Sequence, residues 1–182
     1  MVSQKPKKGN LLVAEPSLTG DVSFNRSVVL IAEHNHEGSV GFILNKPLDY
    51  TICDLVSDIT IPFQVFNGGP VEQDNLYFIH KVPELIENSI EISDGIFWGG
   101  NFEMTVELIN SGTITEQDIR FFLGYSGWGP GQLESEIRTN SWLSIPFNDE
   151  ILFHTPFQNR WEKSIDSLGI AAENLSEEIG HA

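Results

Sequence analysis

Cysteine is almost absent from the chain, because Cys53 is the only one among 182 residues. A single cysteine excludes an internal disulfide and a metal cage built from several cysteines. Stability must therefore come from packing, and a chain of this length can bury about 70% of its surface. The 12 Phe and 4 Trp, within a hydrophobic share of 40%, supply side chains for such a core.

Basic residues are scarce, with 10 Lys and Arg against 26 Asp and Glu and a net charge of −16. Three of the ten, Lys5, Lys7 and Lys8, lie before Gly9, so the remaining body carries seven cations and a net charge of −19. Such a field repels nucleic acid, and neither a basic stripe nor a helix-turn-helix pattern is visible. We expect no direct binding to nucleic acid.

Long apolar runs are also missing, since no stretch approaches the ~18 residues of a membrane helix. Glu15, Pro16 and Asp21 interrupt the apolar run near the N-terminus, which therefore lacks the pattern of a secretory signal peptide. We expect a soluble, cytoplasmic protein that does not bind membranes.

Linkers, low-complexity tracts and internal repeats are absent as well, which favours one domain. We place this domain at residues 9–170. It follows a basic segment, 1–8, that we expect to be disordered, and it precedes an acidic tail, 171–182, that we expect to be frayed.

Short strands and short helices are predicted to alternate irregularly, which indicates an α/β (mixed α+β) fold with a mixed sheet. Residues 27–44 predict a central β-hairpin around a turn at 35–38. The other predicted strands are 11–14, 63–66, 75–81, 90–92, 96–98, 119–125, 141–145 and 150–154. The predicted helices are 51–59, with a capping box at Thr51 and Asp54, and 103–110, 132–140 and 155–168.

The most distinctive local pattern runs from Phe122 to Glu134, where a strand passes through a glycine-rich turn into a helix. Glycine turns at helix N-termini can bind anions, but this one lacks the Lys-Ser/Thr of a phosphate loop. Glu134 and Glu136 would also compete with a phosphate for the helix dipole. A tight crossover with Trp128 packed over it is the favoured interpretation.

Ser126 in this turn nearly matches the nucleophile elbow of serine hydrolases, but Trp128 stands where that motif needs glycine. His154, with Asp149 or Glu150, could act as the base. The alternative is an exposed loop serine and a structural histidine, and we assign no catalytic residue.

Two further sets of residues could carry chemistry. His34 and His36 could ligate a metal beside Glu33 and Glu37, yet no third ligand is identifiable and a solvated polar turn explains the pattern equally well. Cys53 in the first turn of a predicted helix could have a reactive thiol, but a small residue beside the apolar stripe is favoured. We expect neither a metal nor a cofactor.

Three glycine-rich segments remain as candidates for binding a ligand. If each ends a strand of one sheet, they should line a single concave surface with an aromatic wall. The candidate ligand-binding residues are Asn67, Gly68, Gly69, Trp98, Gly99, Gly100, Ser126, Gly127, Trp128, Gly129 and Gly131. Alternatively, the glycines serve only the turns.

A series of segments in fixed order resembles the YqgE/AlgH family of bacterial proteins. The segments are Gly9-Asn10-Leu11-Leu12-Val13-Ala14, Phe24 with Ser27-Val28-Val29, Glu33-His34-Asn35 with Gly38 and Gly41, Asn45-Lys46-Pro47, Asn67-Gly68-Gly69-Pro70-Val71, Trp98-Gly99-Gly100, Gly124-Tyr125-Ser126-Gly127-Trp128, Gly131-Gln132-Leu133-Glu134 and the ending Gly180-His181-Ala182. His36 departs from the acidic or neutral residue that the family pattern leads us to expect.

The resemblance implies a single α/β domain whose bifurcated sheet folds into a pseudo-barrel. It brings no established activity, because the family's label of transcriptional regulator derives from a genetic link to alginate production. We expect a non-enzymatic regulatory or interaction module that binds a protein partner or a small polar ligand. An unrecognised hydrolase-like enzyme around Ser126 is the alternative, and a transcriptional regulator is disfavoured by the negative charge.

Overall fold

A computed structural model of the chain describes residues 5–16 and 25–168. The expectations for residues 1–4 and for the tail 171–182 lie outside this range. The strands are Leu11–Ala14 (β1), Val28–Asn35 (β2), Gly38–Ile43 (β3), Pro47–Thr51 (β4), Gln64–Asn67 (β5), Val71–His80 (β6), Ile90–Ser93 (β7), Ile96–Trp98 (β8), Ile119–Trp128 (β9) and Trp142–Ile145 (β10). The helices are Ile52–Leu55 (α1), Phe102–Asn110 (α2), Gln132–Arg138 (α3) and Arg160–Ser167 (α4), with a π-helical turn at Glu150–His154 (η2) and a 3₁₀ turn at Phe157–Asn159 (η3).

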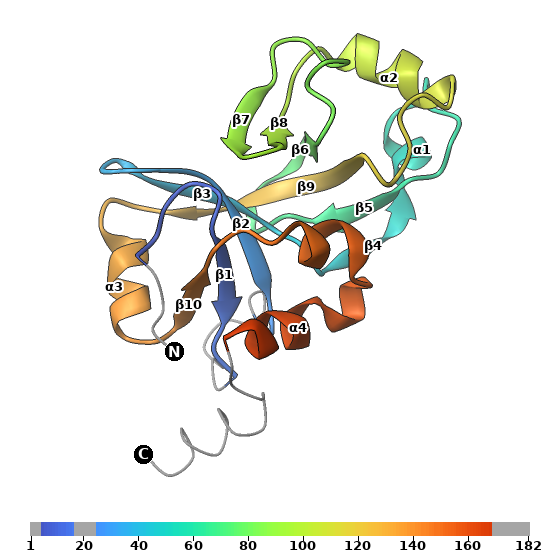
Figure 1. Cartoon of the computed structure of the whole chain (residues 1–182). Coiled ribbons are helices and arrows are strands. Elements are labelled where there is room, and N and C mark those ends of the chain that lie inside the picture. The colour runs from blue at the N-terminus through green and yellow to red at the C-terminus, as the bar shows by residue number, and fades with distance from the viewer. Residues whose placement is uncertain (1–4, 17–24, 169–182) are drawn as a thin grey trace.

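One mixed sheet organises the described part of the chain (Figure 1). Its strands follow the order β10-β1-β2-β3-β9-β6-β8-β7, and this path is open, so the sheet does not form a closed barrel. The sheet divides at the long strand β9, because the first half of β9 pairs with β5 and β6 and its last residues pair with β3. The pairing of β5 with β9 is parallel, and the other pairings are antiparallel. The predicted α/β domain with a mixed, bifurcated sheet is confirmed.

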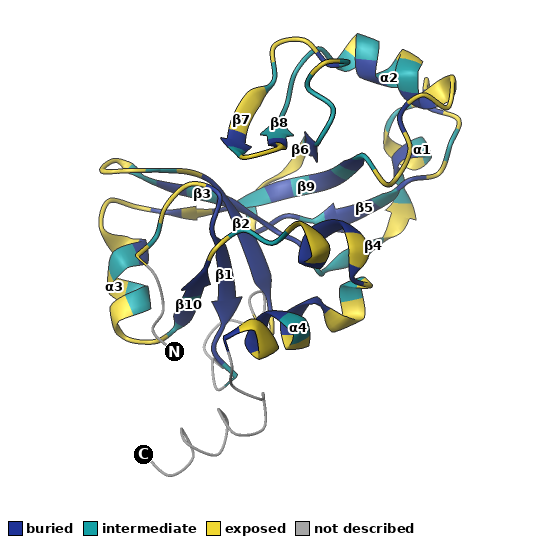
Figure 2. Ribbon diagram, viewed as in Figure 1, coloured by how far each residue is buried: buried dark blue, intermediate teal, exposed yellow. Residues whose placement is uncertain are grey.

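The apolar runs of the sequence become the buried centre of this sheet (Figure 2). Residues 28–32 of β2 and the whole of β1 are buried, as expected for strands that are covered on both faces. The hairpin predicted over 27–44 is formed by β2 and β3, and the Asn35 side chain stabilises its turn by accepting a hydrogen bond from the Glu37 N–H at 2.8 Å.

Three clusters of apolar side chains make up the core. The largest includes the stripe of Trp161, Ile165 and Leu168 from the C-terminal helix, which the sequence spacing predicts. The second gathers around Phe121 beneath α1 and α2, and the third includes Leu133 of α3. The sheet therefore carries cores on both of its faces, and the helices cover them.

The segment 150–154 is a π-helical turn and not the predicted strand. The Asn148 side chain accepts a hydrogen bond from the Glu150 N–H at 3.0 Å, which starts the turn. Ile151, Leu152 and Phe153 are all buried, so a run of three apolar residues cannot distinguish a strand from a buried turn.

Other boundaries also differ from the prediction. The strand predicted at 75–81 begins at Val71 as β6, and the strand β4 was not predicted. The helix predicted over 155–168 is a 3₁₀ turn followed by α4, which starts at Arg160.

The strand predicted at 119–125 continues to Trp128, because β3 supplies a pairing partner for residues 126–128. The helix predicted at 51–59 ends at Leu55, although its N-terminus is correct: the Thr51 N–H donates to the Asp54 carboxylate at 2.8 Å. The end of β9 is therefore set by pairing with a strand that is remote in sequence.

None of the helices formed by the described residues is long and apolar enough to span a bilayer.

Candidate functional site

The first glycine-rich segment packs directly against the backbone of β9. The Gly68 N–H donates to the Leu123 carbonyl at 2.8 Å, and a Cβ atom on Gly68 would lie 2.3 Å from the Gly124 carbonyl oxygen. Gly69 is equally close to β9, and the Asn67 side chain accepts a hydrogen bond from its N–H at 3.1 Å. These glycines therefore serve the parallel contact between β5 and β9.

The second segment, Trp98-Gly99-Gly100, lines an open cavity of about 200 Å³ beside β8, here called the apolar pocket. Its lining residues are Leu76, Tyr77, Phe78, Asn88, Ile90, Trp98, Gly99 and Gly100. Below it, His80 is fully buried and its Nε2 lies 3.2 Å from the Gly99 carbonyl oxygen. Burial lowers the pKa of His80, against smaller opposing effects of the Gly99 hydrogen bond and of Glu84.

The third segment divides between the interior and a second cavity. Ser126 is fully buried and its hydroxyl donates to the Gly68 carbonyl at 3.1 Å, while Gly127 and Trp128 line the cavity. Gly129 and Gly131 lie at the start of α3, where the Gly129 N–H donates to the Gln132 side chain at 2.9 Å. Gly131 is in the left-handed conformation at φ 73°.

The second cavity has a volume of about 270 Å³ and lies between the tip of the β2–β3 hairpin and the end of β9. We call it the acidic pocket. Its lining residues are Glu33, Asn35, Glu37, Gly38, Ser39, Val40, Tyr125, Gly127 and Trp128.

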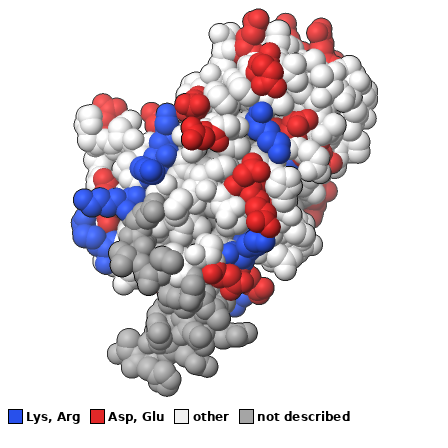
Figure 3. All heavy atoms as spheres, in the orientation of Figure 1, with Lys and Arg blue, Asp and Glu red and all other residues white. Residues whose placement is uncertain are grey.

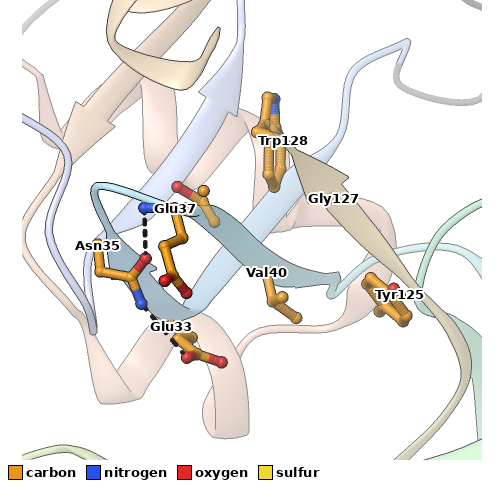
Figure 4. A pocket seen from close by; sticks show the side chains of 9 residues that line it. Glu33, Asn35, Glu37, Val40, Tyr125, Gly127 and Trp128 are labelled. Atoms are coloured by element: carbon orange, nitrogen blue, oxygen red, sulfur yellow. Dashed lines mark hydrogen bonds between the residues drawn. The ribbon is translucent and has the colours of Figure 1, made fainter. Parts of the chain in front are cut away.

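The side chains of the acidic pocket come from three neighbouring strands and from the turn between β2 and β3 (Figure 4). Glu33 faces Val40 across the hairpin, and Val40 faces Gly127 on β9. Because Gly127 has no side chain, the surface stays open between Val40 and Tyr125. Glu33 and Glu37 are exposed on the same side of the hairpin, and Asn35 lies between them with its amide 3.5 Å from the Glu33 carboxylate.

A pair of touching aromatic rings links the linings of the two cavities. Tyr125 of the acidic pocket and Tyr77 of the apolar pocket have ring centroids 5.9 Å apart in an edge-to-face arrangement. The predicted set of candidate residues is thus distributed over two adjacent cavities and one buried backbone contact.

In the sequence, Glu33 and Glu37 stand out only beside a possible metal site, and Asn35, Val40 and Tyr125 are not among the candidate ligand-binding residues. These residues could not be identified because the sequence does not show which strand positions lie side by side. Phe122 and Tyr125 contact the same core cluster although they are three residues apart in a strand, because Gly124 between them is left-handed at φ 73° and shifts the alternation.

The histidines of the hairpin tip already have partners or lie in solvent. His34 Nδ1 lies 2.6 Å from the Ser39 hydroxyl, and its Nε2 lies 3.7 Å from the Glu134 carboxylate. His36 is exposed. Within residues 5–16 and 25–168, no three His, Cys, Asp or Glu side chains converge on a common point.

The hydrolase-like residues are not joined into a catalytic arrangement. The Ser126 hydroxyl is occupied by the Gly68 carbonyl, and His154 is paired with Asp149 at 3.4 Å on the surface. No hydrogen bond links Ser126 to His154 in the described part of the chain.

Two arginines elsewhere in the molecule, one buried and one half-buried, bind backbone carbonyls. Arg160 is 5% exposed and donates to the carbonyls of Leu44 and Thr155. Burial, reinforced by the nearby charge of Arg120, lowers the pKa of Arg160 to about 10. Arg120 in turn donates to the Ile119 carbonyl and lies over the Phe153 ring. These contacts fasten the C-terminal turns to the sheet.

The visible surface agrees with the excess of carboxylates. Figure 3 shows acidic side chains spread over this face, with the basic ones in isolated patches. Among the described residues, Lys163 with Glu150 at 2.7 Å is the one ion pair between a carboxylate and a lysine or arginine. The Glu33 and Glu37 carboxylates of the acidic pocket are exposed and form no ion pair with a described lysine or arginine.

These features define a single-domain α/β protein with a forked sheet and a small acidic pocket at the hairpin tip. A family model described as AlgH-like matches residues 11–173, and the chain belongs to this AlgH-like family. The resemblance seen in the sequence is confirmed.

Curated relatives extend over nearly the whole chain. A UPF0301 protein of Chlorobium limicola is 43% identical over 168 residues, which are 91% of this chain and 88% of the relative. A UPF0301 protein of Cytophaga hutchinsonii is 42% identical over 164 residues, or 89% of this chain and 90% of the relative.

Solved structures share the fold. The AlgH protein of Pseudomonas aeruginosa superposes with a TM-score of 0.73 at 28% identity, covering 97% of both chains. Protein DIP2367 of Corynebacterium diphtheriae superposes with a TM-score of 0.77 at 24% identity, covering 92% of this chain and 90% of that one.

Proposed function

We propose that this protein is a non-enzymatic interaction module whose acidic pocket binds an ammonium or guanidinium group. The observation that carries the proposal is the arrangement of Glu33, Asn35 and Glu37 along one wall and Tyr125 along the other. Two carboxylates supply charge-assisted acceptors, and an aromatic ring favours a cation near its face.

The whole molecule supports a cationic ligand. A net charge of −16 raises the local concentration of cations and speeds their encounter with the surface. The same charge opposes the binding of DNA, which is why a direct role in transcription is not proposed. The buried hydroxyl of Ser126 supports a binding role over hydrolysis.

The test uses blocked arginine, N-acetyl-arginine methylamide, with the neutral isostere N-acetyl-citrulline methylamide as the control ligand. Backbone amide shifts are followed by NMR at about 0.15 M salt, where the Debye length is ~8 Å. We expect saturable shifts at Gly38, Val40 and Gly127 with arginine and not with citrulline.

Two variants link the result to the pocket. Glu33→Gln/Glu37→Gln removes the two exposed carboxylates and should weaken arginine binding by about tenfold or more, since each hydrogen bond to a charged group is worth roughly 1.5–3 kcal/mol. Glu103→Gln/Glu107→Gln removes two exposed carboxylates from α2 and should leave binding unchanged. Equal shifts with citrulline, or equal losses in both variants, would contradict the proposal.

A further inference from the structure

The apolar pocket differs in chemistry from the acidic pocket. It is lined by the rings of Tyr77 and Trp98 and by the aliphatic side chain of Ile90. Ile90 is 56% exposed, the largest exposed fraction among the exposed large hydrophobic side chains of the described residues. It lies on β7, the last strand of the sheet path, so the pocket opens at an edge of the sheet.

The two pockets lie on one continuous aromatic surface. Phe42 lies beneath it, with its ring centroid 5.6 Å from that of Tyr77 and 5.8 Å from that of Trp98. Tyr77 also contacts Tyr125, the wall of the acidic pocket. The Tyr77 hydroxyl donates to the Glu72 carboxylate at 2.9 Å, which fixes the ring and adds a third carboxylate beside the surface.

The sizes of the pockets indicate what can fill them. At about 270 and 200 Å³, each is smaller than the ~300–1,000 Å³ of a typical site for a drug-sized molecule. Each can hold one side chain. Two small pockets of different chemistry that share a wall therefore fit two side chains of one chain better than one compact metabolite.

We propose that the partner is a protein segment in extended conformation that places a Lys or Arg in the acidic pocket and a large aliphatic side chain in the apolar pocket. The proposal rests on the function proposed above, and it names the partner class. In an extended chain, side chains two and four positions apart lie on the same face at about 7 and 14 Å, so these two spacings are the ones to test. The charge of Glu33, Glu37 and Glu72 selects a basic segment.

The experiment compares short blocked peptides in the same NMR titration. The probes are acetyl-Gly-Arg-Gly-Leu-Gly-amide and acetyl-Gly-Arg-Gly-Gly-Gly-Leu-Gly-amide, each with a partner peptide in which Gly replaces Leu. We expect the better leucine peptide to bind about tenfold or more tightly than its glycine partner, because burying a leucine side chain supplies a gain of that order.

Two variants test whether the tighter binding of the leucine peptide comes from the apolar pocket. Ile90→Thr keeps a β-branched residue on β7 and should remove the advantage of leucine without changing the affinity for the glycine peptide. Leu55→Gln, which removes another exposed aliphatic side chain from α1, should preserve the advantage.

The outcomes separate the two proposals. If the glycine peptides bind through Glu33 and Glu37 but leucine adds nothing, or its gain survives Ile90→Thr, the two-pocket partner is overturned and the cationic site stands. If no arginine-containing peptide binds, both proposals fail.

Discussion

His80 shows how one buried side chain holds the backbone beneath the apolar pocket. Its Nδ1 accepts the Val82 N–H at 3.2 Å, so the neutral ring carries its proton on Nε2 and can donate it to the Gly99 carbonyl. Phe78 and Phe97 stack against the ring from neighbouring positions. A second proton on the ring would break the contact with Val82.

This arrangement makes the stability of the fold depend on pH. Burial lowers the pKa of His80 in the folded state below its ordinary value of 6.5, so the unfolded chain binds the proton more readily. The stabilising contribution is complete above pH 6.5 and is lost progressively as the pH falls below it. As the pH falls from about 7.5 to about 5.5, we expect the unfolding free energy of the wild type to decrease more than that of His80→Gln.

Urea unfolding at several pH values measures this difference. His36→Gln, which removes an exposed histidine from the hairpin tip, should retain the wild-type pH dependence. A profile for His80→Gln that runs parallel to the wild type would show that His80 does not titrate in this range.

Among the elements, α3 is fastened to the sheet by a single carboxylate. The Glu136 Oε1 atom accepts the indole N–H of Trp128 at 3.1 Å and that of Trp142 at 3.0 Å, which joins the helix to β9 and β10. Gln132 on the preceding turn of α3 donates to the other carboxylate oxygen at 2.9 Å. Glu136, which in the sequence argued against a phosphate site at the start of this helix, therefore serves to attach the helix to the sheet.

Replacing Glu136 by alanine should destabilise the protein by at least about 2 kcal/mol, because each buried donor that loses its acceptor costs roughly 1–3 kcal/mol. Thermal or urea unfolding followed by tryptophan fluorescence measures the loss. Ser135→Ala on the exposed side of α3 should change stability by about 0.5 kcal/mol or less. Equal stability of the two variants would mean that the indole contacts do not hold the helix.

Elements with a strong local signal were predicted correctly, whereas those defined by a remote partner were not. The β2–β3 hairpin has turn residues between apolar runs, and α4 has an apolar stripe at helical spacing, so both are visible in the sequence. The turn η2 contains three consecutive buried apolar residues, and their spacing matches neither the alternation of a strand nor the stripe of a helix. The last three residues of β9, Ser126-Gly127-Trp128, belong to the segment read from the sequence as a glycine-rich turn, and they become a strand because β3 pairs with them.

At the scale of the whole molecule, charge decides which partners can approach. The seven cations from Gly9 onward are few, and Arg160 is buried against backbone carbonyls. A body with so few cations has little means of releasing counterions from duplex DNA.

We therefore expect no saturable shift of duplex DNA in an electrophoretic assay at micromolar protein and about 0.15 M salt, although nonspecific binders reach dissociation constants of roughly 10⁻⁴–10⁻⁶ M under such conditions. Lowering the salt should not produce binding, because the net interaction is repulsive. A sequence-selective complex at nanomolar protein would overturn this expectation and restore the regulator label as a direct activity.

The sequence by itself determined the family, the single mixed α/β domain, most strands and the acidic character, because these follow from composition, short-range pattern and segment order. It could not determine the site. The acidic pocket depends on the register that places Glu33 opposite Val40 and Val40 opposite Gly127, and on the left-handed Gly124 that turns Tyr125 toward Tyr77. Strand register and the facing of side chains are set by contacts between segments far apart in the chain, so only the tertiary structure brought the two pockets together.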